Sequence, residues 1–174
     1  MKINTKDLVT IPLFSAIICI LSIISIPFGA IPVSLSVLAV FLTAIILGLK
    51  KSVIAVLIYI LLGSLGLPVF SGFKGGIQVL FGPTGGYIIS YIFICVIMGF
   101  TSDNLSRFKH KKTLLFASSV LSLILCYITG SVQYMLISSV SFNKAFFSSA
   151  LFFFPIDILK SVLAITVGKR LKIR

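Results

Sequence analysis

The stretch LVTIPLFSAIICILSIISI, from Leu8 to Ile26, contains 19 residues and no charged side chain. At about 1.5 Å per residue, a helix of this length spans about 28 Å, close to the roughly 30 Å of a bilayer's hydrocarbon core. The stretch is longer than the apolar region of a signal peptide, which has about 7–15 residues, and no small-residue cleavage site follows it. We therefore interpret it as a retained first membrane helix.

The rest of the chain has the same character. Hydrophobic residues make up 59% of the sequence, charged residues only 10%, and the mean hydropathy is +1.23. A soluble domain carries about 25% charged residues. The 174 residues leave room for about six spans of roughly 20 residues and for no separate extramembrane domain. The composition therefore predicts an all-α membrane protein that forms one integral membrane domain over residues 1–174.

Proline, glycine and charged residues divide the apolar runs into separate helices. The predicted helices are 8–26, 34–49, 52–67, 85–100, 114–138 and 155–168, and the predicted outer loops, which would cap a substrate, are 27–33 and 69–84. The last helix is expected to begin at Pro155, because a proline lacks an N–H that the first helical position does not need. A longer, kinked helix that includes Phe146–Phe154 is the alternative.

The formal net charge of +12 is explained by topology. Of the 15 Lys and Arg residues, 12 fall into four clusters, which are Lys2 and Lys6; Lys50 and Lys51; Arg107, Lys109, Lys111 and Lys112; and Lys169, Arg170, Lys172 and Arg174. In a six-helix protein these four positions lie on one side, which the positive-inside rule makes cytoplasmic. Both termini are therefore predicted to be cytoplasmic. Because the clusters are short connectors and form no folded basic face, no nucleic-acid partner is expected.

One of the three acidic residues lies where a membrane protein rarely has one. Asp7 and Asp103 are at expected helix ends, but Asp157 precedes Lys169 by 12 residues, about 18 Å along a helix. An ionisable group at that depth is costly and is typical of a functional site. Lys160 is its predicted partner, three residues on along the same helical face. The alternative is a purely structural pair in which Asp157 caps the start of a helix.

The segment VFSGFKGGIQVLFGPTGGY, Val69–Tyr87, contains six of the 13 glycines. Non-helical backbone at membrane depth is tolerated only where it is buried or lines a cavity. Lys74, Gln78 and Tyr87 are the polar side chains of this segment that we expect to contact a ligand. Together with Asp157 and Lys160 at the same outer end, they predict a site for a small, partly polar, anionic organic molecule.

The sequence argues against an enzyme. His110 is the single histidine and lies in a polar loop, so no catalytic dyad can be assembled. The phosphate-binding motif G-x-x-x-x-G-K-[ST] does not occur, and the chain therefore has no visible means of hydrolysing ATP. Cys19, Cys95 and Cys126 lie in apolar runs without metal-ligand spacing, so neither a metal nor another cofactor is expected.

Several motifs make the chain similar to one known family. They are ISIP at Ile24–Pro27, then IPVSLSVLAVFL, YILLGSLGLPVFSG and GPTGGY, and finally DILK at Asp157–Lys160. This combination, over nearly the whole chain, resembles BioY, the biotin-binding S-components of energy-coupling factor (ECF) transporters. The resemblance implies a high-affinity vitamin-capture subunit with six helices in the cell membrane of a bacterium or archaeon.

The resemblance also implies roles for individual residues. Asp157 would accept a hydrogen bond from a ureido N–H of biotin, and either Lys160 or Lys74 would meet the valerate carboxylate. The remaining predicted contacts are Gly75 and Gly76 as close backbone, Phe73 and Tyr87 as apolar walls, and Gln78. Ser36 stands where the family often has glutamine and would be a shorter substitute.

Family members work with a transmembrane T-component and two cytoplasmic ATPases, which implies the same partners here. The family usually presents an A-x-x-x-A face on the first helix to the T-component. This chain has Ser15, Cys19 and Ser22 along that stripe, and small residues permit close helix approach. The alternative is ordinary packing of these residues within the bundle. Two other functions stay open: an S-component for a different small vitamin, and a membrane assembly protein without a ligand.

Overall fold

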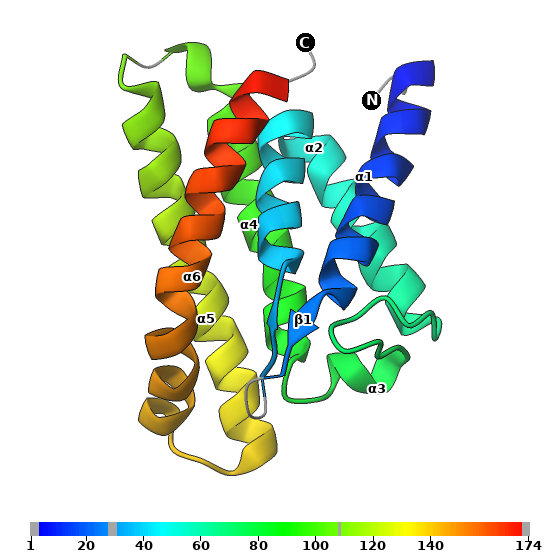
Figure 1. Ribbon diagram of the computed structural model, residues 1–174, viewed down its shortest axis with the longest axis vertical. Helices are drawn as coiled ribbons and strands as arrows, with labels where there is room; N and C mark the ends of the chain where they lie inside the picture. The colour runs from blue at the N-terminus through cyan, green and yellow to red at the C-terminus, as the bar shows by residue number, and fades with distance from the viewer. Residues whose placement is uncertain (1–3, 28–30, 108, 172–174) are drawn as a thin grey trace.

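The computed structural model of the chain describes residues 4–27, 31–107 and 109–171, and for 148–152 it describes the backbone alone. Part of the predicted loop 27–33 and the basic residues Lys2, Lys172 and Arg174 therefore lie outside the described residues. The described chain is mostly helical, and its long helices run alongside one another (Figure 1). In order, the elements are α1 Thr5–Ile23, β1 Ser25–Ile26, β2 Val33–Ser34, α2 Ser36–Ser64, α3 Ile77–Leu80, α4 Gly85–Asp103, the 3-10 turn η1 Leu105–Arg107, α5 Lys111–Ser138 and α6 Phe142–Leu171.

The described residues include four helices that are long and apolar enough to cross a membrane, namely α1, α2, α4 and α5. The outward faces of the helices are also apolar. Ile20 is 62% exposed, Leu136 is 70% exposed and Leu159 is 62% exposed. Large apolar side chains on this scale are stable on an outer surface when lipid rather than water is the solvent.

The helix α2 reverses direction at Gly48. This residue has φ 74° and ψ −175°, which are not helical angles, and Figure 1 shows the two halves of α2 running in opposite directions on either side of the break. Asp103, at the end of α4, stabilises the reversal because its Oδ2 accepts the backbone N–H of Leu49 at 2.9 Å. A carboxylate is thus bound to the N-terminus of the second half, where the helix dipole favours negative charge.

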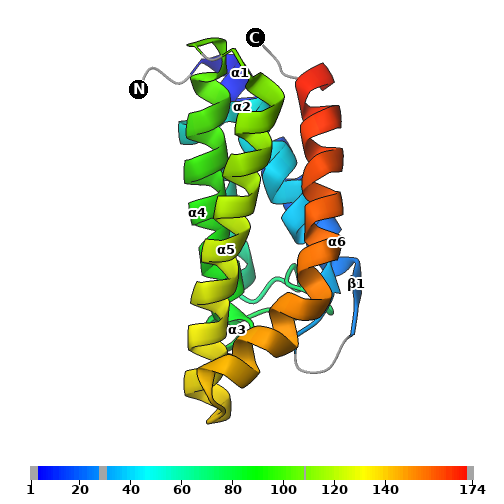
Figure 2. The ribbon, with the colours of Figure 1, turned by 90° about the vertical axis from the view of Figure 1, so that its left-hand side faces the viewer.

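The helix α6 begins at Phe142, so the predicted start at Pro155 is wrong. Pro155 lies inside the helix, where its ring and missing N–H favour a bend. Figure 2 shows α6 bent along its orange part. Asp157 therefore belongs to a helix interior, and the interpretation that it caps a helix start does not hold.

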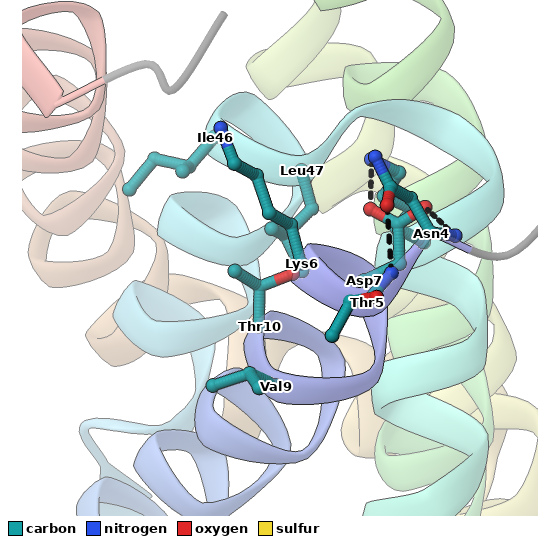
Figure 3. A pocket seen from close by; sticks show the side chains of 9 residues that line it. Asn4, Thr5, Lys6, Asp7, Val9, Thr10, Ile46 and Leu47 are labelled. Atoms are coloured by element: carbon teal, nitrogen blue, oxygen red, sulfur yellow. Dashed lines mark hydrogen bonds and ion pairs between the residues drawn. The ribbon is translucent and has the colours of Figure 1, made fainter.

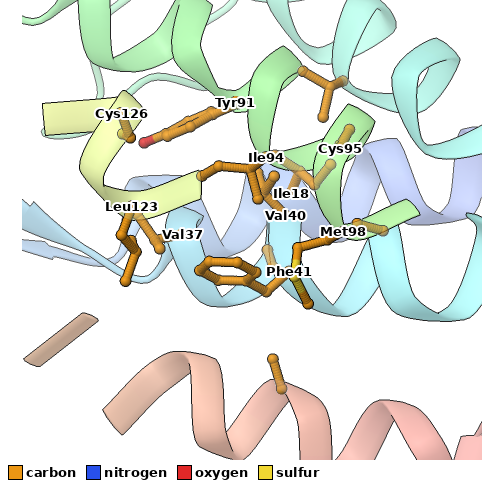
Figure 4. Close-up of a cluster of buried hydrophobic side chains, with 14 of the residues drawn as sticks. Ile18, Val37, Val40, Phe41, Tyr91, Ile94, Cys95, Met98, Leu123 and Cys126 are labelled. Atoms are coloured by element: carbon orange, nitrogen blue, oxygen red, sulfur yellow. The ribbon is translucent and has the colours of Figure 1, made fainter. Parts of the chain in front are cut away.

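The core lies between α1, α2, α4, α5 and α6. Figure 4 shows Ile18, Val40, Phe41, Ile94 and Met98 converging there, and all five are 0% exposed. The helix α4 is central, since it packs against both α2 and α5. The predicted span of α4 begins with the glycines of GPTGGY. One of them, Gly86, permits close contact with α5, because a Cβ at Gly86 would lie 2.6 Å from the Thr129 carbonyl oxygen.

The two ends of the bundle differ in chemistry. The start of α1, the break in α2, η1, the start of α5 and the end of α6 lie together (Figure 1), and we call this the basic end because the described members of the four Lys/Arg clusters belong to these segments. The antiparallel hairpin β1–β2 and α3 lie at the other end, which we call the hairpin end. The Gly72 N–H donates to Ser25 Oγ at 3.0 Å, which joins the loop after α2 to the hairpin.

We expect Gly48→Ala to destabilise the fold by roughly 2–6 kcal/mol. Its backbone conformation is accessible almost only to glycine, at a cost of about 1–3 kcal/mol for other residues, and overpacking adds about 1–3 kcal/mol. The added Cβ would lie 2.1 Å from Asp103 Oδ1. The measurement is thermal or chemical unfolding in detergent micelles.

Gly66→Ala is the matched control. Gly66 also has a positive φ, of 104°, but a Cβ there meets nothing within 4 Å. We expect this control to lose only about 1–2 kcal/mol from backbone strain. Equal losses in the two variants would contradict the assignment of Asp103 to the reversal.

Candidate ligand-binding site

A buried ion pair lies in the half of the bundle toward the hairpin end. Asp157 and Lys160 are 7% and 6% exposed, and Lys160 Nζ is 2.7 Å from Asp157 Oδ1. The hydroxyl of Tyr127, on α5, donates to Asp157 Oδ2 at 2.6 Å. Lys160 Nζ also donates to the carbonyl oxygen of Ser34 at 2.7 Å. Both carboxylate oxygens are thus hydrogen-bonded, which a buried charge requires.

The local sequence explains why these groups meet. Asp157 and Lys160 are three residues apart and therefore share one face of α6. That helix packs against α2 and α5, so the face meets Tyr127 on one side. The strand β2 brings the Ser34 carbonyl to the other side. The helices α5 and α6 and the strand β2 are distant in the sequence, and this one ion pair connects them.

Two adjoining cavities extend from the ion pair. The first, of about 50 Å³, is lined by Asp157, Lys160, Tyr127, Cys126, Phe153, Val33 and Val37 and by five further residues. The second, of about 40 Å³, is lined by Lys74, Ser22, Tyr59, Phe70, Ser71, Val79, Thr84 and Ile88 and by the same five. The shared residues are Ile31, Pro32, Ser34, Tyr87 and Tyr91. The cavities therefore form one path from the ion pair to the loop after α2.

Tyrosine side chains dominate the walls of this path. Of the five tyrosines in the chain, four line it: Tyr59, Tyr87, Tyr91 and Tyr127. Tyr87 and Tyr127 meet edge to face at 6.4 Å, and Tyr59 and Tyr91 stack at 6.4 Å. Tyrosine offers an apolar ring and a polar hydroxyl. The walls can therefore contact both halves of an amphipathic ligand.

Small hydroxyl groups fix these rings. Ser22 Oγ is 2.7 Å from the Tyr59 hydroxyl. Ser36 Oγ is 2.5 Å from the Tyr91 hydroxyl and is hydrogen-bonded to Ser34 Oγ as well. Ser36 itself is fully buried. The predicted ligand contact Ser36 therefore acts behind Tyr91, while Ser34 lines both cavities.

Some residues of the covering loop, 69–84, line the cavities, and others do not. Lys74 lines the second cavity, and Tyr87, just after the loop, lines both. Phe73 is 71% exposed and is not a wall of either cavity. Gln78 is exposed, and its Nε2 donates to the Gly75 carbonyl oxygen at 2.9 Å.

Gly75 and Gly76 attach the loop to the end of α2 instead of lining the site. A Cβ at Gly75 would lie 2.5 Å from the Leu67 carbonyl oxygen, and the Gly76 N–H donates to the Gly63 carbonyl oxygen at 2.7 Å. Phe70 is 1% exposed and covers Gly63, where an added Cβ would lie 2.1 Å from its ring. Phe70 also meets Tyr59 edge to face at 5.4 Å.

The sequence did not single out Tyr59, Tyr91, Tyr127 or Ser34. A usable signal existed for the tyrosines, because Tyr59, Tyr91 and Tyr127 lie within apolar runs, whereas membrane tyrosines concentrate at the interfaces. A buried hydroxyl needs a partner. Gln133 was also missed: its Nε2 donates to the carbonyl oxygens of Leu80 and Gly82, at 2.7 and 2.8 Å, and ties the covering loop to α5.

The stripe predicted to face a partner is buried inside the bundle. Ser15, Cys19 and Ser22 are 1%, 8% and 1% exposed, and Ser22 is bonded to Tyr59 of α2. These side chains therefore pack within the bundle, which was the alternative interpretation.

A larger cavity, of about 630 Å³, lies at the basic end between the start of α1 and the break in α2 (Figure 3). Asp7 and Lys51 pair there, and Asn4, Thr5 and Lys6 are exposed. Most of its lining is exposed or half-buried, so it does not enclose a ligand as small-molecule sites do. The candidate ligand site is therefore the path beside Asp157.

The path is nearly closed in this structure. Cavities of about 40 and 50 Å³ are far smaller than the roughly 300–1,000 Å³ of typical ligand pockets. The lining includes the covering loop and residues 31–34 after the hairpin turn. A ligand larger than a few water molecules must displace these segments from the helices.

Comparisons with known proteins agree with this geometry. A sequence model of the BioY family matches residues 1–174. The "Probable biotin transporter BioY" of Pyrococcus horikoshii is 37% identical over 169 residues, which are 97% of this chain and 98% of that protein. The "Biotin transporter BioY" of Thermotoga maritima is 38% identical over 167 residues, 96% of each. The crystal structure of the S-component for biotin from an ECF-type ABC transporter matches with a TM-score of 0.87 and 27% identity, over 95% of this chain and 90% of that one.

Fold and site together define a multi-pass membrane protein with an enclosed, tyrosine-lined polar site near one end. Within that class, the chain belongs to the BioY family. The resemblance inferred from the sequence motifs is thereby confirmed.

The buried pair should show strong coupling in a double-mutant cycle. We expect Lys160→Met to destabilise the ligand-free protein by about 3–5 kcal/mol, because it leaves Asp157 buried without a cation. The double variant Asp157→Leu/Lys160→Met should lose much less than the sum of the single losses. Unfolding in detergent without ligand measures Asp157→Leu, Lys160→Met and the double variant. Additive losses would contradict the coupling of the two charges.

Proposed function

We propose that this protein is the biotin-binding, substrate-capture S-component of an ECF-type vitamin transporter. The observation that carries the proposal is the buried Asp157–Lys160 pair at the end of a closed path of tyrosines, in a chain of the BioY family. Relatives over nearly the full length are biotin transporters, and the matching crystal structure is an S-component for biotin.

The ureido ring of biotin suits the cavity beside Asp157. The ring has two N–H donors and one carbonyl acceptor. Asp157 accepts one hydrogen bond at each oxygen, and a carboxylate oxygen has lone pairs for more than one donor. A ureido N–H would donate to Asp157, while the Tyr127 and Tyr87 rings would cover the apolar thiophane ring.

The valerate carboxylate would meet Lys74. Lys160 is already neutralised by Asp157 at 2.7 Å, and a second carboxylate beside that pair would repel the first in a poorly solvated site. Lys74 is exposed at the far side of the second cavity, so its ammonium can pair with the carboxylate where water still solvates both. Biotin would then lie along the path with its ring inward.

The remaining parts of the transporter belong to other chains in this proposal. The six predicted spans and the four basic clusters favour cytoplasmic termini in the cell membrane, so that the hairpin end would face outward. A T-component and two ATPases would supply ATP hydrolysis, since the sequence contains no phosphate-binding loop. No cofactor is required for capture.

Replacing Asp157 with Asn should raise the Kd for biotin by roughly 10- to 100-fold, because a hydrogen bond to a charged group contributes about 1.5–3 kcal/mol. Equilibrium binding of labelled biotin to purified protein measures this. Asp7→Asn is the control, since Asp7 also pairs with a lysine but lies at the basic end. Unchanged affinity in Asp157→Asn, or preference for thiamine or riboflavin in the wild type, would overturn the proposal.

Biotin and its methyl ester separate the roles of the two lysines. We expect Lys74→Gln to weaken biotin binding by about 2- to 5-fold and to leave binding of the methyl ester nearly unchanged, since the ester lacks the charge that Lys74 would meet. Lys144→Gln, which removes an exposed lysine that lines neither cavity, should change neither affinity. If Lys74→Gln weakens both ligands equally, the carboxylate does not meet Lys74.

A further inference from the structure

Another cavity, lined partly by cationic side chains, lies at the basic end, between the start of α5 and the end of α6. Its volume is about 430 Å³, and its lining is Lys112 and Phe116 from α5 and Val162, Ile165, Thr166, Lys169 and Arg170 from α6. We call it the α5–α6 groove. It shares no residue with the candidate biotin path.

The cations of the α5–α6 groove have no side-chain carboxylate to neutralise them. The chain contains three acidic residues, and each is engaged elsewhere: Asp7 with Lys51, Asp103 with the Leu49 N–H and Asp157 with Lys160. Desolvation by burial, followed by the nearby charges of Lys112 and Lys111, lowers the pKa of Lys169. An anion from outside the chain would relieve the repulsion between these like charges.

Both walls of the groove change from cationic to apolar along the helix axis. On α5, Lys112 is followed one turn later by Phe116, which is 43% exposed. On α6, Lys169 and Arg170 are preceded by Ile165 and by Val162, which is 42% exposed. The cations thus lie at the basic end of the groove, and its apolar surface extends toward the middle of the bundle.

We infer that the α5–α6 groove binds an anionic glycerophospholipid. The headgroup phosphate would lie among Lys112, Lys169 and Arg170, and an acyl chain would lie against Phe116, Val162 and Ile165. Basic pockets between membrane helices bind lipid phosphates in this way. A free phosphate shares the headgroup chemistry, but it leaves the apolar half of the groove empty. The apolar half therefore favours the lipid.

The test is a titration of the full chain in dodecyl maltoside micelles with phosphatidylglycerol, followed by thermal shift and by native mass spectrometry. The groove variant is Lys112→Gln/Lys169→Gln/Arg170→Gln. The control variant is Lys6→Gln/Lys50→Gln/Arg107→Gln, which removes the same charges from exposed residues at the same end. The charge-conserving variant Lys112→Arg/Lys169→Arg checks that charge is what matters.

We expect phosphatidylglycerol to bind the wild type, the control variant and the charge-conserving variant with affinities within about threefold of one another. The groove variant should bind it on the order of 100-fold more weakly, since three cations near an anionic lipid are removed. Phosphatidylcholine should bind weakly to all four proteins. The unfolding temperature and biotin affinity without added lipid verify that the groove variant is folded.

Three outcomes overturn the inference. Equal weakening in the groove and control variants would indicate a general effect of net charge. A thermal shift with inorganic phosphate as large as that with phosphatidylglycerol would assign the groove to a soluble anion. No difference between phosphatidylglycerol and phosphatidylcholine in the wild type would exclude headgroup recognition. If the groove variant does not fold, Lys112→Gln alone is the reporter, with an expected loss of about fivefold.

Discussion

The structure depends on a salt bridge that must stay buried. Asp157 and Lys160 lie inside a bundle whose outer face is apolar, where an unpaired charge would be very unfavourable. Their hydrogen bonds extend to Tyr127 on α5 and to the backbone of Ser34 on β2. Helix α6, helix α5 and the hairpin segment are therefore positioned relative to one another by a single charged cluster, which is also the polar end of the ligand path.

Hydrogen bonds among the hydroxyl groups of the path explain why the path is so narrow. Its hydroxyl groups are hydrogen-bonded to one another, as in Ser34–Ser36–Tyr91 and Ser22–Tyr59. With these groups satisfied, the rings pack closely and leave cavities of about 40 and 50 Å³. The covering loop and the segment after the hairpin turn supply the non-helical walls of the path, while the ion pair and the tyrosines lie on the helices. The polar groups of the path and the segments that cover it thus belong to different parts of the chain.

Sequence reasoning predicted the features that come from strong local signals. The long apolar runs predicted the helices, and the pair Asp157 and Lys160 was found because charge is rare at membrane depth. Residues whose role depends on three-dimensional neighbours were missed or misjudged. Tyr127 is adjacent to Asp157 only through the packing of α5 on α6. Pro155 looked like a helix start, but the tertiary structure carries the helix through it. Ser15 and Cys19 have the composition of a partner interface, and only their burial reveals which neighbour they contact.

The contact between Phe70 and Gly63 packs the covering loop against the end of α2. The ring of Phe70 occupies the space that a side chain at position 63 would fill, and it rests against the ring of Tyr59. This closure is made by apolar shape and not by charge. Salt and pH are therefore expected to change the stability of this contact little. Temperature is expected to change it more, because apolar burial weakens on cooling. The entrance to the site is thus closed by apolar contact, whereas its inner end is held by charge.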